Sequence, residues 1–441
     1  MSVSTPPMLS GALPIIGHTI EMIRSRERLF KRGYQELGDL FTIKLGPLNV
    51  VVVTGAEHNK QFYTETDKSL TMREGYDFLR EAIGEVLFTA DMATYYNQRP
   101  VLLEAFKRER MVGYIDAMNS EVSRWLDALG QSGEMDLSAE MLKVTQSVAG
   151  RAFVGEHFRE ELGEEFWKLY EAIGASMDPI LPPKLPLPKF IRRDRARPKL
   201  IQIMSKVIAK RRAHPEQYND VISILLHTPC KDGTFMPDKT VVDVFIGLIF
   251  AGHETTAGQA AWLLASLIRH PKHLAVVRDE LSANMAAADE AVSHKVMSKL
   301  EYTYWAIDET TRMYPSADTQ LRTVGTPIEI GGYQIPVGWR LMVNATNSHK
   351  LAEEFSDPEV FDPSRYSPER GEGKDPYTIV GFGGGIHKCT GMNFAKNEMA
   401  IITAKLFQQF DVELLSDDIR VITGNGANRP SAIRVRYTRK D

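Results

Sequence analysis

The longest run of apolar positions at helical spacing lies between residues 238 and 270. Its sequence, DKTVVDVFIGLIFAGHETTAGQAAWLLASLIRH, is apolar on almost every side, which is typical of a helix buried through the centre of a domain. Asp238 is expected to cap its start and Pro271 to stop it. At 1.5 Å per residue such a helix is roughly 48 Å long.

Helical spacing also dominates residues 98–175 and 195–227, and the proline-rich stretch 181–190 between them is expected to be a surface loop. Alternating, strand-like runs occur at 41–46 and 49–55, which suggest a hairpin or a sheet, and short ones again at 328–343. Residues 1–20 are expected to form an irregular N-terminal arm. The sequence therefore predicts a mainly α-helical protein with a minor β region, folded as one domain over residues 1–441.

Charge and cysteine content exclude several classes of protein. The chain has 53 basic and 57 acidic residues, a net charge of −4, so nothing suggests a nucleic-acid partner. Its two cysteines, Cys230 and Cys389, exclude a disulfide framework, and we expect a reducing, cytoplasmic location. No segment approaches the roughly 20 consecutive apolar residues of a membrane span, so no membrane anchor is expected.

Candidate chemistry is concentrated in the sequence FGGGIHKCTG, residues 382–391. Glycine-rich backbone can approach a flat ligand closely, and the adjacent His387 and Lys388 favour the thiolate form of Cys389. A helical pattern follows the cysteine, so the partial positive charge of a helix N-terminus is added near the sulfur. This combination suits an anionic sulfur that binds the iron of a large planar cofactor.

This decapeptide resembles the haem-binding loop of the cytochrome P-450 mono-oxygenases. The matching positions are Phe382, Gly385, His387, Cys389 and Gly391. The resemblance implies the P-450 fold, with haem b between the long central helix and the helix after the cysteine loop. It makes Cys389 the axial ligand of the iron, with Phe382, Gly383 and Gly391 beside the cofactor. A free cysteine on a glycine-rich turn is the alternative interpretation, and the five matches disfavour it.

The central run contains AGHETT, which is similar to the oxygen-activating segment of the same family. The hydroxyl of Thr255 is expected to bond back to the helix near Ala251 and to open a groove. Glu254 and Thr255 would then form the proton path that reductive activation of dioxygen requires. Phe250 and Ala251 are expected to face the substrate, and Ala251 also to face the cofactor.

Three charged residues resemble the structural network of that family. Glu309 and Arg312 lie three residues apart, on one helix face, and FDPSRY follows them at 361–366. The resemblance makes Glu309, Arg312 and Arg365 a buried scaffold behind the cysteine loop.

Haem carboxylates require cationic partners, and four residues match these positions. They are His387, Arg322, Arg99 and Tyr95, the last in place of the family's tryptophan. Because a residue before proline is disfavoured in helical conformation, Pro100 is expected to place Arg99 at the start of a helix.

Within the family, residues 74–88 and 258–271 resemble the sterol demethylases. Tyr76, Phe78 and Phe88 would contact the substrate, although ordinary aromatic packing under a loop explains them equally well. Three departures argue against a plain sterol: Glu254, Ile386 and the polar run 316–320.

From that polar run we expect Asp318 or Thr319 to bind a polar or basic group of a lipophilic, sterol- or terpenoid-like substrate. A carboxylate in a pocket wall is costly unless a cation or hydrogen bonds meet it. The alternative is that Asp318 caps a turn and points to solvent.

Electrons are expected from NAD(P)H through a separate donor of ferredoxin or flavodoxin type, because the chain leaves no room for a reductase module. Five cations could form a positive face for an acidic donor, or simply be solvated: Lys107, Arg108, Arg110, Lys388 and Lys396. A monomer is expected. A peroxide-driven haem-thiolate enzyme and a non-catalytic haem sensor are the alternative functions, and the Glu254–Thr255 pair argues against both.

Overall fold

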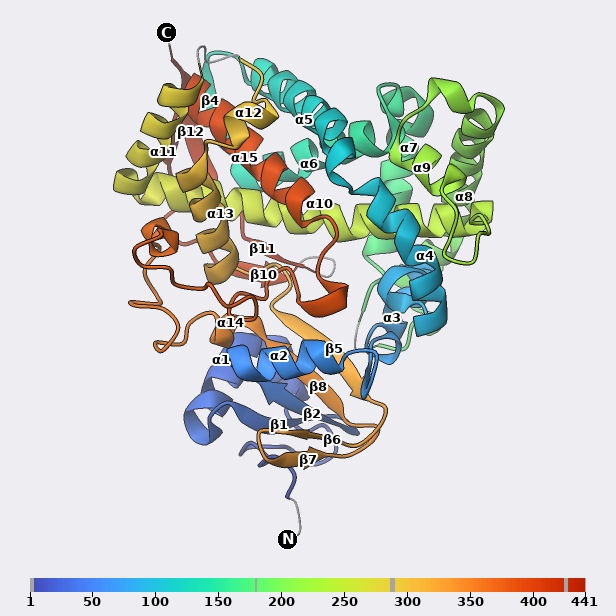
Figure 1. Cartoon of the computed structure of the whole chain (residues 1–441), viewed down its shortest axis with the longest axis vertical. Helices are drawn as coiled ribbons and strands as arrows, with labels where there is room; N and C mark the ends of the chain where they lie inside the picture. The colour runs from blue at the N-terminus through green and yellow to red at the C-terminus, as the bar shows by residue number, and fades with distance from the viewer. Residues whose placement is uncertain (1–3, 179–180, 286–289, 424–426, 441) are drawn as a thin grey trace. The chain divides into compact units, whose positions relative to one another are not determined.

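The computed structural model describes residues 4–178, 181–285, 290–423 and 427–440, so residues 1–3 of the predicted arm lie outside the described part (Figure 1). The chain divides into two compact units. The first contains Met1–Asp77 and Glu309–Cys389, and the second contains Phe78–Asp308 and Thr390–Asp441.

The first unit is built on a five-stranded sheet in the order β1-β2-β8-β5-β3. Its strands are β1 (Leu40–Leu45), β2 (Leu48–Val53), β3 (Leu70–Thr71), β5 (Thr319–Val324) and β8 (Arg340–Asn344). The predicted hairpin is confirmed, since β1 and β2 pair antiparallel with Leu45 opposite Leu48. β8 runs parallel to β2 and antiparallel to β5.

Side chains alternate between the two faces of this sheet, as strand geometry requires. Phe41 and Val52 pack on one face with Phe30 of α1 (Thr19–Leu37). Val51 and Val53 pack on the other face with Phe62 of α2 (Ala56–Glu65). The remaining elements of this unit are β6 (Ile328–Ile330), β7 (Tyr333–Ile335), α14 (Ala345–Ser348) and the 3-10 helices Arg73–Gly75, Pro363–Tyr366 and Gly385–His387.

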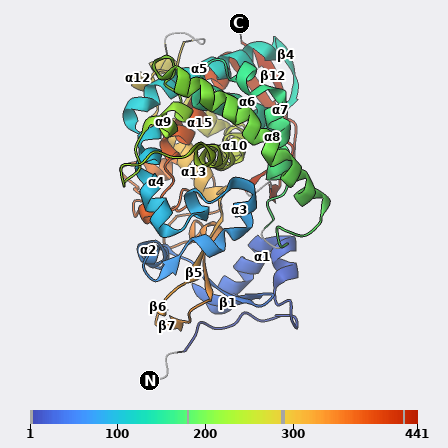
Figure 2. The ribbon, with the colours of Figure 1, turned by 90° about the vertical axis from the view of Figure 1, so that its right-hand side faces the viewer.

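The second unit is mostly helical and has α10 (Asp238–Arg269) at its centre, seen along its axis in Figure 2. α10 packs against α6, α8, α9 and α15 and against β11. The helices of this unit are α3 (Asp77–Ile83), α4 (Met92–Ala105), α5 (Arg108–Leu129), α6 (Leu137–Val154), α7 (Phe158–Gly174), α8 (Pro188–Ala213), α9 (Val221–His227), α11 (Pro271–Asn284), α12 (His294–Met297) and α15 (Met392–Gln409). α13 (Glu301–Met313) passes from this unit into the first.

Two small sheets and two 3-10 helices complete the second unit. One sheet joins β4 (Ser132–Asp136), β12 (Arg434–Arg439) and β9 (Phe410–Leu414), and the other joins β10 (Val421–Thr423) and β11 (Asn428–Pro430). The 3-10 helices are Leu87–Thr89 and Pro215–Gln217.

Only one end of α10 lies where the sequence predicted it. Pro271 follows the helix and begins α11, so the predicted stop is confirmed. The predicted cap is wrong by one residue: Pro237 is the N-cap, and Asp238 is the first helical residue. The Asp238 carboxylate instead accepts hydrogen bonds from Arg212 of α8, which makes it a tertiary contact rather than a cap.

Arg99 is placed differently from the prediction. It lies in the middle of α4, which continues through Pro100. Proline removes one backbone donor from a helix interior. α4 nevertheless buries Val101 and Leu102, and Asp91 caps its start by accepting a bond from the Thr94 N–H at 2.7 Å. Burial and capping therefore outweigh the local preference.

By length and composition α10 could cross a membrane, contrary to the expectation that no segment could. However, 72% of its most apolar window is buried inside the chain. Contact with other helices, rather than with lipid, accounts for its apolar surface.

Candidate active site

The cysteine loop is closed by its own backbone hydrogen bonds. The Cys389 N–H donates to the Phe382 carbonyl at 2.9 Å, and the Gly383 N–H donates to Val380 at 2.9 Å. Gly383 and Gly385 have φ of 71° and 61°, a conformation that favours glycine. This compact loop leaves Cys389 exposed.

Packing against Tyr63 of α2 explains why two positions of the loop are glycine. A Cβ on Gly384 would lie 2.7 Å from the Tyr63 ring, and one on Gly385 would lie 3.0 Å from the Tyr63 carbonyl oxygen. The sequence attributed these glycines to close approach of a cofactor. The structure shows that the protein itself requires at least Gly384, because no side chain fits against the ring.

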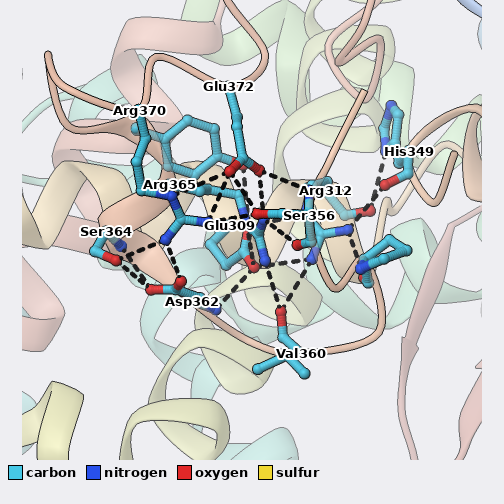
Figure 3. Close-up of polar contacts among 12 residues, drawn as sticks. Glu309, Arg312, His349, Ser356, Val360, Asp362, Ser364, Arg365, Arg370 and Glu372 are labelled. Atoms are coloured by element: carbon cyan, nitrogen blue, oxygen red, sulfur yellow. Dashed lines mark hydrogen bonds and ion pairs between the residues drawn. The ribbon is translucent and has the colours of Figure 1, made fainter. Parts of the chain in front are cut away.

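Behind the loop, Glu309 is held between two arginines (Figure 3). Arg312 donates to both carboxylate oxygens at 2.8 Å, and Arg365 Nε donates to Oε1 at 3.0 Å. All three side chains are 0% exposed. The structure therefore brings together the three residues that the sequence grouped, two from one helix and one from a distant segment.

The remaining donors of both guanidinium groups reach backbone carbonyls and, for Arg365, also the Glu372 carboxylate. Arg312 donates to the carbonyls of His349 and Pro358, and Arg365 to those of Ser356 and Val360. These bonds fix the chain segments that lead into the cysteine loop. Buried charges are tolerated where such additional hydrogen bonds exist.

His349 is part of this arrangement and was not found from the sequence. Its Nδ1 lies 3.0 Å from the Arg312 carbonyl, and its Nε2 accepts the Val380 N–H at 2.8 Å. Val380 comes two residues before Phe382. His349 thus connects the charge network to the start of the cysteine loop. No spacing or motif marked it, since its partners are distant in sequence.

We expect His349 to make the fold acid-sensitive. Burial lowers the pKa of His349 to about 3 from an ordinary 6.5, so the unfolded chain binds a proton that the folded chain rejects. Stability contributed by the neutral ring is present above pH 6.5 and is lost as the pH falls towards 3. Between pH 6.5 and 4, wild type should lose about 3 kcal/mol more unfolding free energy than H349Q, measured by denaturant titration.

Substitution H157Q is the matched control, because the His157 side chain is 71% exposed. Its acid profile should follow that of wild type. An H349Q profile that also follows wild type would contradict the assignment.

On α10 the exposed positions cluster around Ala251 and Gly252, within a helix buried on both sides of them. A Cβ on Gly252 would meet nothing within 4 Å. The Thr255 hydroxyl donates to the Ala251 carbonyl at 2.6 Å, as predicted. The backbone of α10 is helical throughout this stretch, so the bond does not open the groove that the sequence predicted, although the stretch itself is exposed.

His253, on the opposite side of this stretch, is buried and lies with Nε2 2.9 Å from the Leu142 carbonyl of α6. Burial lowers the pKa of its imidazole, so the ring is neutral. Burial also raises the pKa of the neighbouring Tyr170, and the charge of Glu254 adds to that effect. These contacts fix the rotation of α10 about its axis.

The residues predicted to bind the haem carboxylates are divided between the two units. In the first unit, Arg322 is 1% exposed and contacts Thr66 Oγ1 at 3.2 Å and the Leu321 carbonyl. His387 Nε2 lies 2.6 Å from the Asp67 carboxylate. In the second unit, Nε of Arg99 is buried without a hydrogen-bond partner among the described residues.

A model of the cytochrome P450 family matches residues 6–433. The chain belongs to this family. It is 30% identical to a sterol 14alpha-demethylase of Mycolicibacterium vanbaalenii over 94% of the chain and 92% of that protein. It is 28% identical to a sterol 14-demethylase of Arabidopsis thaliana over 99% of the chain and 91% of that protein. A solved structure of a retinoic acid-bound cyanobacterial CYP120A1 matches at 25% identity, with a TM-score of 0.90 and full coverage of both chains.

The protein is therefore a P450 mono-oxygenase with the mainly helical P450 fold, and its family implies haem. The described residues fit that cofactor. Arg322 is a buried cation whose hydrogen bonds all go to neutral groups among the described residues, so a haem carboxylate would satisfy it. Exposed Cys389 is accessible to iron.

The polar run 316–320 has partners within the first unit. Arg26 of α1 lies 2.9 Å from the Asp318 carboxylate, and Gln320 donates to the Val380 carbonyl at 3.1 Å. The Asp318 side chain is therefore paired with a cation of the protein itself and does not point freely into solvent. Thr319 begins β5, opposite Asn344 of β8.

The predicted substrate aromatics are all half-buried. Tyr76 belongs to the first unit, and Phe78 and Phe88 belong to the second. In the second unit, a Cβ on Gly84 would lie 2.3 Å from the Asp243 carboxylate of α10. Gly84 is therefore required for this loop to pack on α10, a packing role that the sequence did not indicate.

Proposed function

We propose that this P450 binds haem b through Cys389 and oxidises a small lipophilic, sterol- or terpenoid-like substrate. The observation that supports it most is the stretch of α10 with exposed Ala251 and Gly252 beside Glu254 and the Thr255 hydroxyl. Thiolate-bound haem supplies the activation of dioxygen. The chain supplies the sulfur ligand, the protons and the surface on which the substrate is oriented.

In this proposal the Thr255 Oγ1 and the Glu254 carboxylate hold and transfer protons at α10. The bond from Thr255 to the Ala251 carbonyl fixes the position of the hydroxyl oxygen, and a hydroxyl that donates one bond can also accept others. The resemblance to the family makes His387, Arg322, Arg99 and Tyr95 the partners of the haem carboxylates. Glu309, Arg312 and Arg365 would act only as a scaffold.

Replacing Thr255 by alanine is expected to lower product formed per NAD(P)H by about 10²-fold, the usual scale of proton-transfer catalysis. Reductant should still be consumed, because electron delivery needs no proton path, and hydrogen peroxide should accumulate. T255S restores the hydroxyl and should recover most of the coupling.

T256V is the control, since Thr256 is buried on the next position of the same helix. Unchanged coupling in T255A would contradict the proton role. Turnover of wild type with peroxide, but not with donor and NAD(P)H, would favour a peroxygenase instead.

The substrate class is supported by the relatives, whose names specify sterol demethylation or bound retinoic acid, all isoprenoid-derived and lipophilic. Arg26 already balances the charge of Asp318, so a basic group is not needed on the substrate. Phe250 and Ala251 on α10, with the half-buried Tyr76, Phe78 and Phe88, would provide apolar contacts. Thr319 would be the polar contact.

Electrons would come from NAD(P)H through a ferredoxin- or flavodoxin-type donor. Three of the five proposed docking cations are paired internally: Lys107 and Arg110 with Glu104, and Lys396 with Asp308. Exposed Arg108, Lys299 and His294 line one cavity of about 610 Å³ in the second unit. Glu301 also lines this cavity. We propose Arg108 and Lys299 as contacts for an acidic donor, and Lys388 of the first unit as a further cation.

A further inference from the structure

An apolar protrusion on the first unit has no role in the chemistry above. Five large apolar side chains between residues 13 and 23 are exposed to solvent. They are Leu13, Ile15, Ile16, Ile20 and Ile23. Elsewhere in the described chain such residues form smaller groups, the largest in sequence being Leu181, Leu185 and Ile191. Single exposed apolar residues are normal on a protein surface. The cluster between residues 13 and 23 is called the apolar tip below.

The backbone holds the apolar tip outward at an energetic cost. Leu13 and Gly17 exchange two backbone hydrogen bonds, of 3.1 and 2.9 Å, and so close a tight loop. Within it the Ile16 N–H donates to the Pro14 carbonyl at 2.7 Å, and Ile15 has a φ of 64°. This is a γ-turn of the rare positive-φ type, which is unfavourable for a β-branched residue. Its central side chain, Ile15, is 87% exposed.

The loop is rigidly attached to the sheet. The His18 N–H donates to the Lys44 carbonyl at 2.6 Å, and His18 Nδ1 accepts the Lys44 N–H at 3.1 Å. A Cβ on Gly17 would lie 2.1 Å from the same carbonyl oxygen, so only glycine fits there. A strained, rigid turn that presents isoleucine to water gains nothing for folding, which indicates an external apolar partner.

α1, which carries Ile20 and Ile23 of the apolar tip, has five basic and three acidic residues. Arg26 and Arg32 of this helix are paired with carboxylates. Three other cations are exposed and have no ion pair among the described residues: Arg24, Arg28 and Lys31. Ser25, with φ −162° and ψ 80°, interrupts α1. Arg24 therefore lies on the same stretch of helix as Ile20 and Ile23, whereas Arg28 and Lys31 follow the interruption, next to exposed Glu27. Apolar side chains beside unpaired cations form the pattern that adsorbs to anionic lipid headgroups.

We propose that the apolar tip and these three cations dock the protein on an anionic bilayer surface. The isoleucines would enter the boundary between headgroups and acyl chains, and the cations would contact lipid phosphates and carboxylates. Such adsorption is peripheral and reversible. It would place the enzyme where a lipophilic substrate is concentrated, but it does not depend on the proposed chemistry.

Sedimentation of the haem-loaded, full-length protein with vesicles tests this proposal. Wild type should bind 7:3 phosphatidylcholine:phosphatidylserine vesicles about tenfold or more tightly than pure phosphatidylcholine vesicles, and added salt should weaken the difference. I15S/I23S and R24Q/R28Q should each weaken binding by about tenfold or more. V337S, at a residue 56% exposed elsewhere on the same unit, is the matched apolar control and should bind as wild type does.

Misfolding is separated from loss of binding by I15G. Glycine adopts positive φ without strain, so the melting temperature should be unchanged or higher while vesicle binding falls. Equal binding by wild type and I15S/I23S would overturn the proposal, as would no binding to either vesicle. Size-exclusion chromatography adds an opposing outcome: a wild-type dimer that I15S converts to monomer would identify a second copy as the occupant. Because binding is read from sedimentation, failure of the oxidation proposal would not affect the result.

Discussion

Cys389→His is expected to abolish mono-oxygenation and to remove the red-displaced carbon monoxide absorption that a thiolate gives ferrous haem. Thiolate donates electron density to iron and favours O–O cleavage, and imidazole does not. Cys389 is exposed at the end of a loop that is closed by backbone hydrogen bonds. The substitution should therefore leave the loop folded, and the protein should still bind haem. Product formation should fall below detection, whereas any loss of folding should be small.

Cys230→Ser is the control for this experiment. Cys230 is 7% exposed and lies in a turn in which the Gly233 N–H donates to the Cys230 carbonyl at 3.0 Å. Burial raises the pKa of its thiol. Its substitution should leave the absorption spectrum and activity unchanged. If C389H gave the wild-type spectrum, or if C230S lost it, the assignment of the axial ligand would be wrong.

The sequence could predict the contacts of this site that join residues close together in the chain. The bond from Thr255 to Ala251 connects residues one helical turn apart, and Glu309 and Arg312 share a helix face, so spacing alone specifies both. Arg365 was grouped with them only through a resemblance to the family. The arrangement of β1 and β2 followed from alternation and a short turn.

The sequence could not predict the contacts between segments that are far apart in the chain. His349 meets Arg312 and Val380, and Asp318 meets Arg26, with no periodic signal to pair them. Arg99 was misplaced for a related reason, because packing and capping of α4 outweigh a local preference near proline. The exposed isoleucines belonged to a segment described only as an irregular arm. Their exposure depends on Gly17 and His18 fixing the loop to β1.

Glu309→Gln is expected to destabilise the fold by about 3–5 kcal/mol, because it leaves Arg312 and Arg365 buried with no carboxylate between them. The side chain is nearly the same size, so the loss comes from charge rather than from a cavity. Denaturant titration should show it, and haem should dissociate at lower denaturant, since the network holds the segments next to the cysteine loop. Glu164→Gln, which breaks an exposed pair with Lys168, is the control and should change stability by less than about 1 kcal/mol.

A second carboxylate, that of Glu372, makes the prediction for E309Q more specific. Arg365 also contacts Glu372 at 2.6 Å, whereas the carboxylate partner of Arg312 is Glu309. In E309Q, therefore, Arg365 keeps one anion and Arg312 loses its own. Adding R312M to E309Q removes the stranded cation, and the double variant should be more stable than the sum of the two single substitutions predicts. Additive losses would mean that the three residues act through packing alone, and the buried charge balance would not be what supports the cysteine loop.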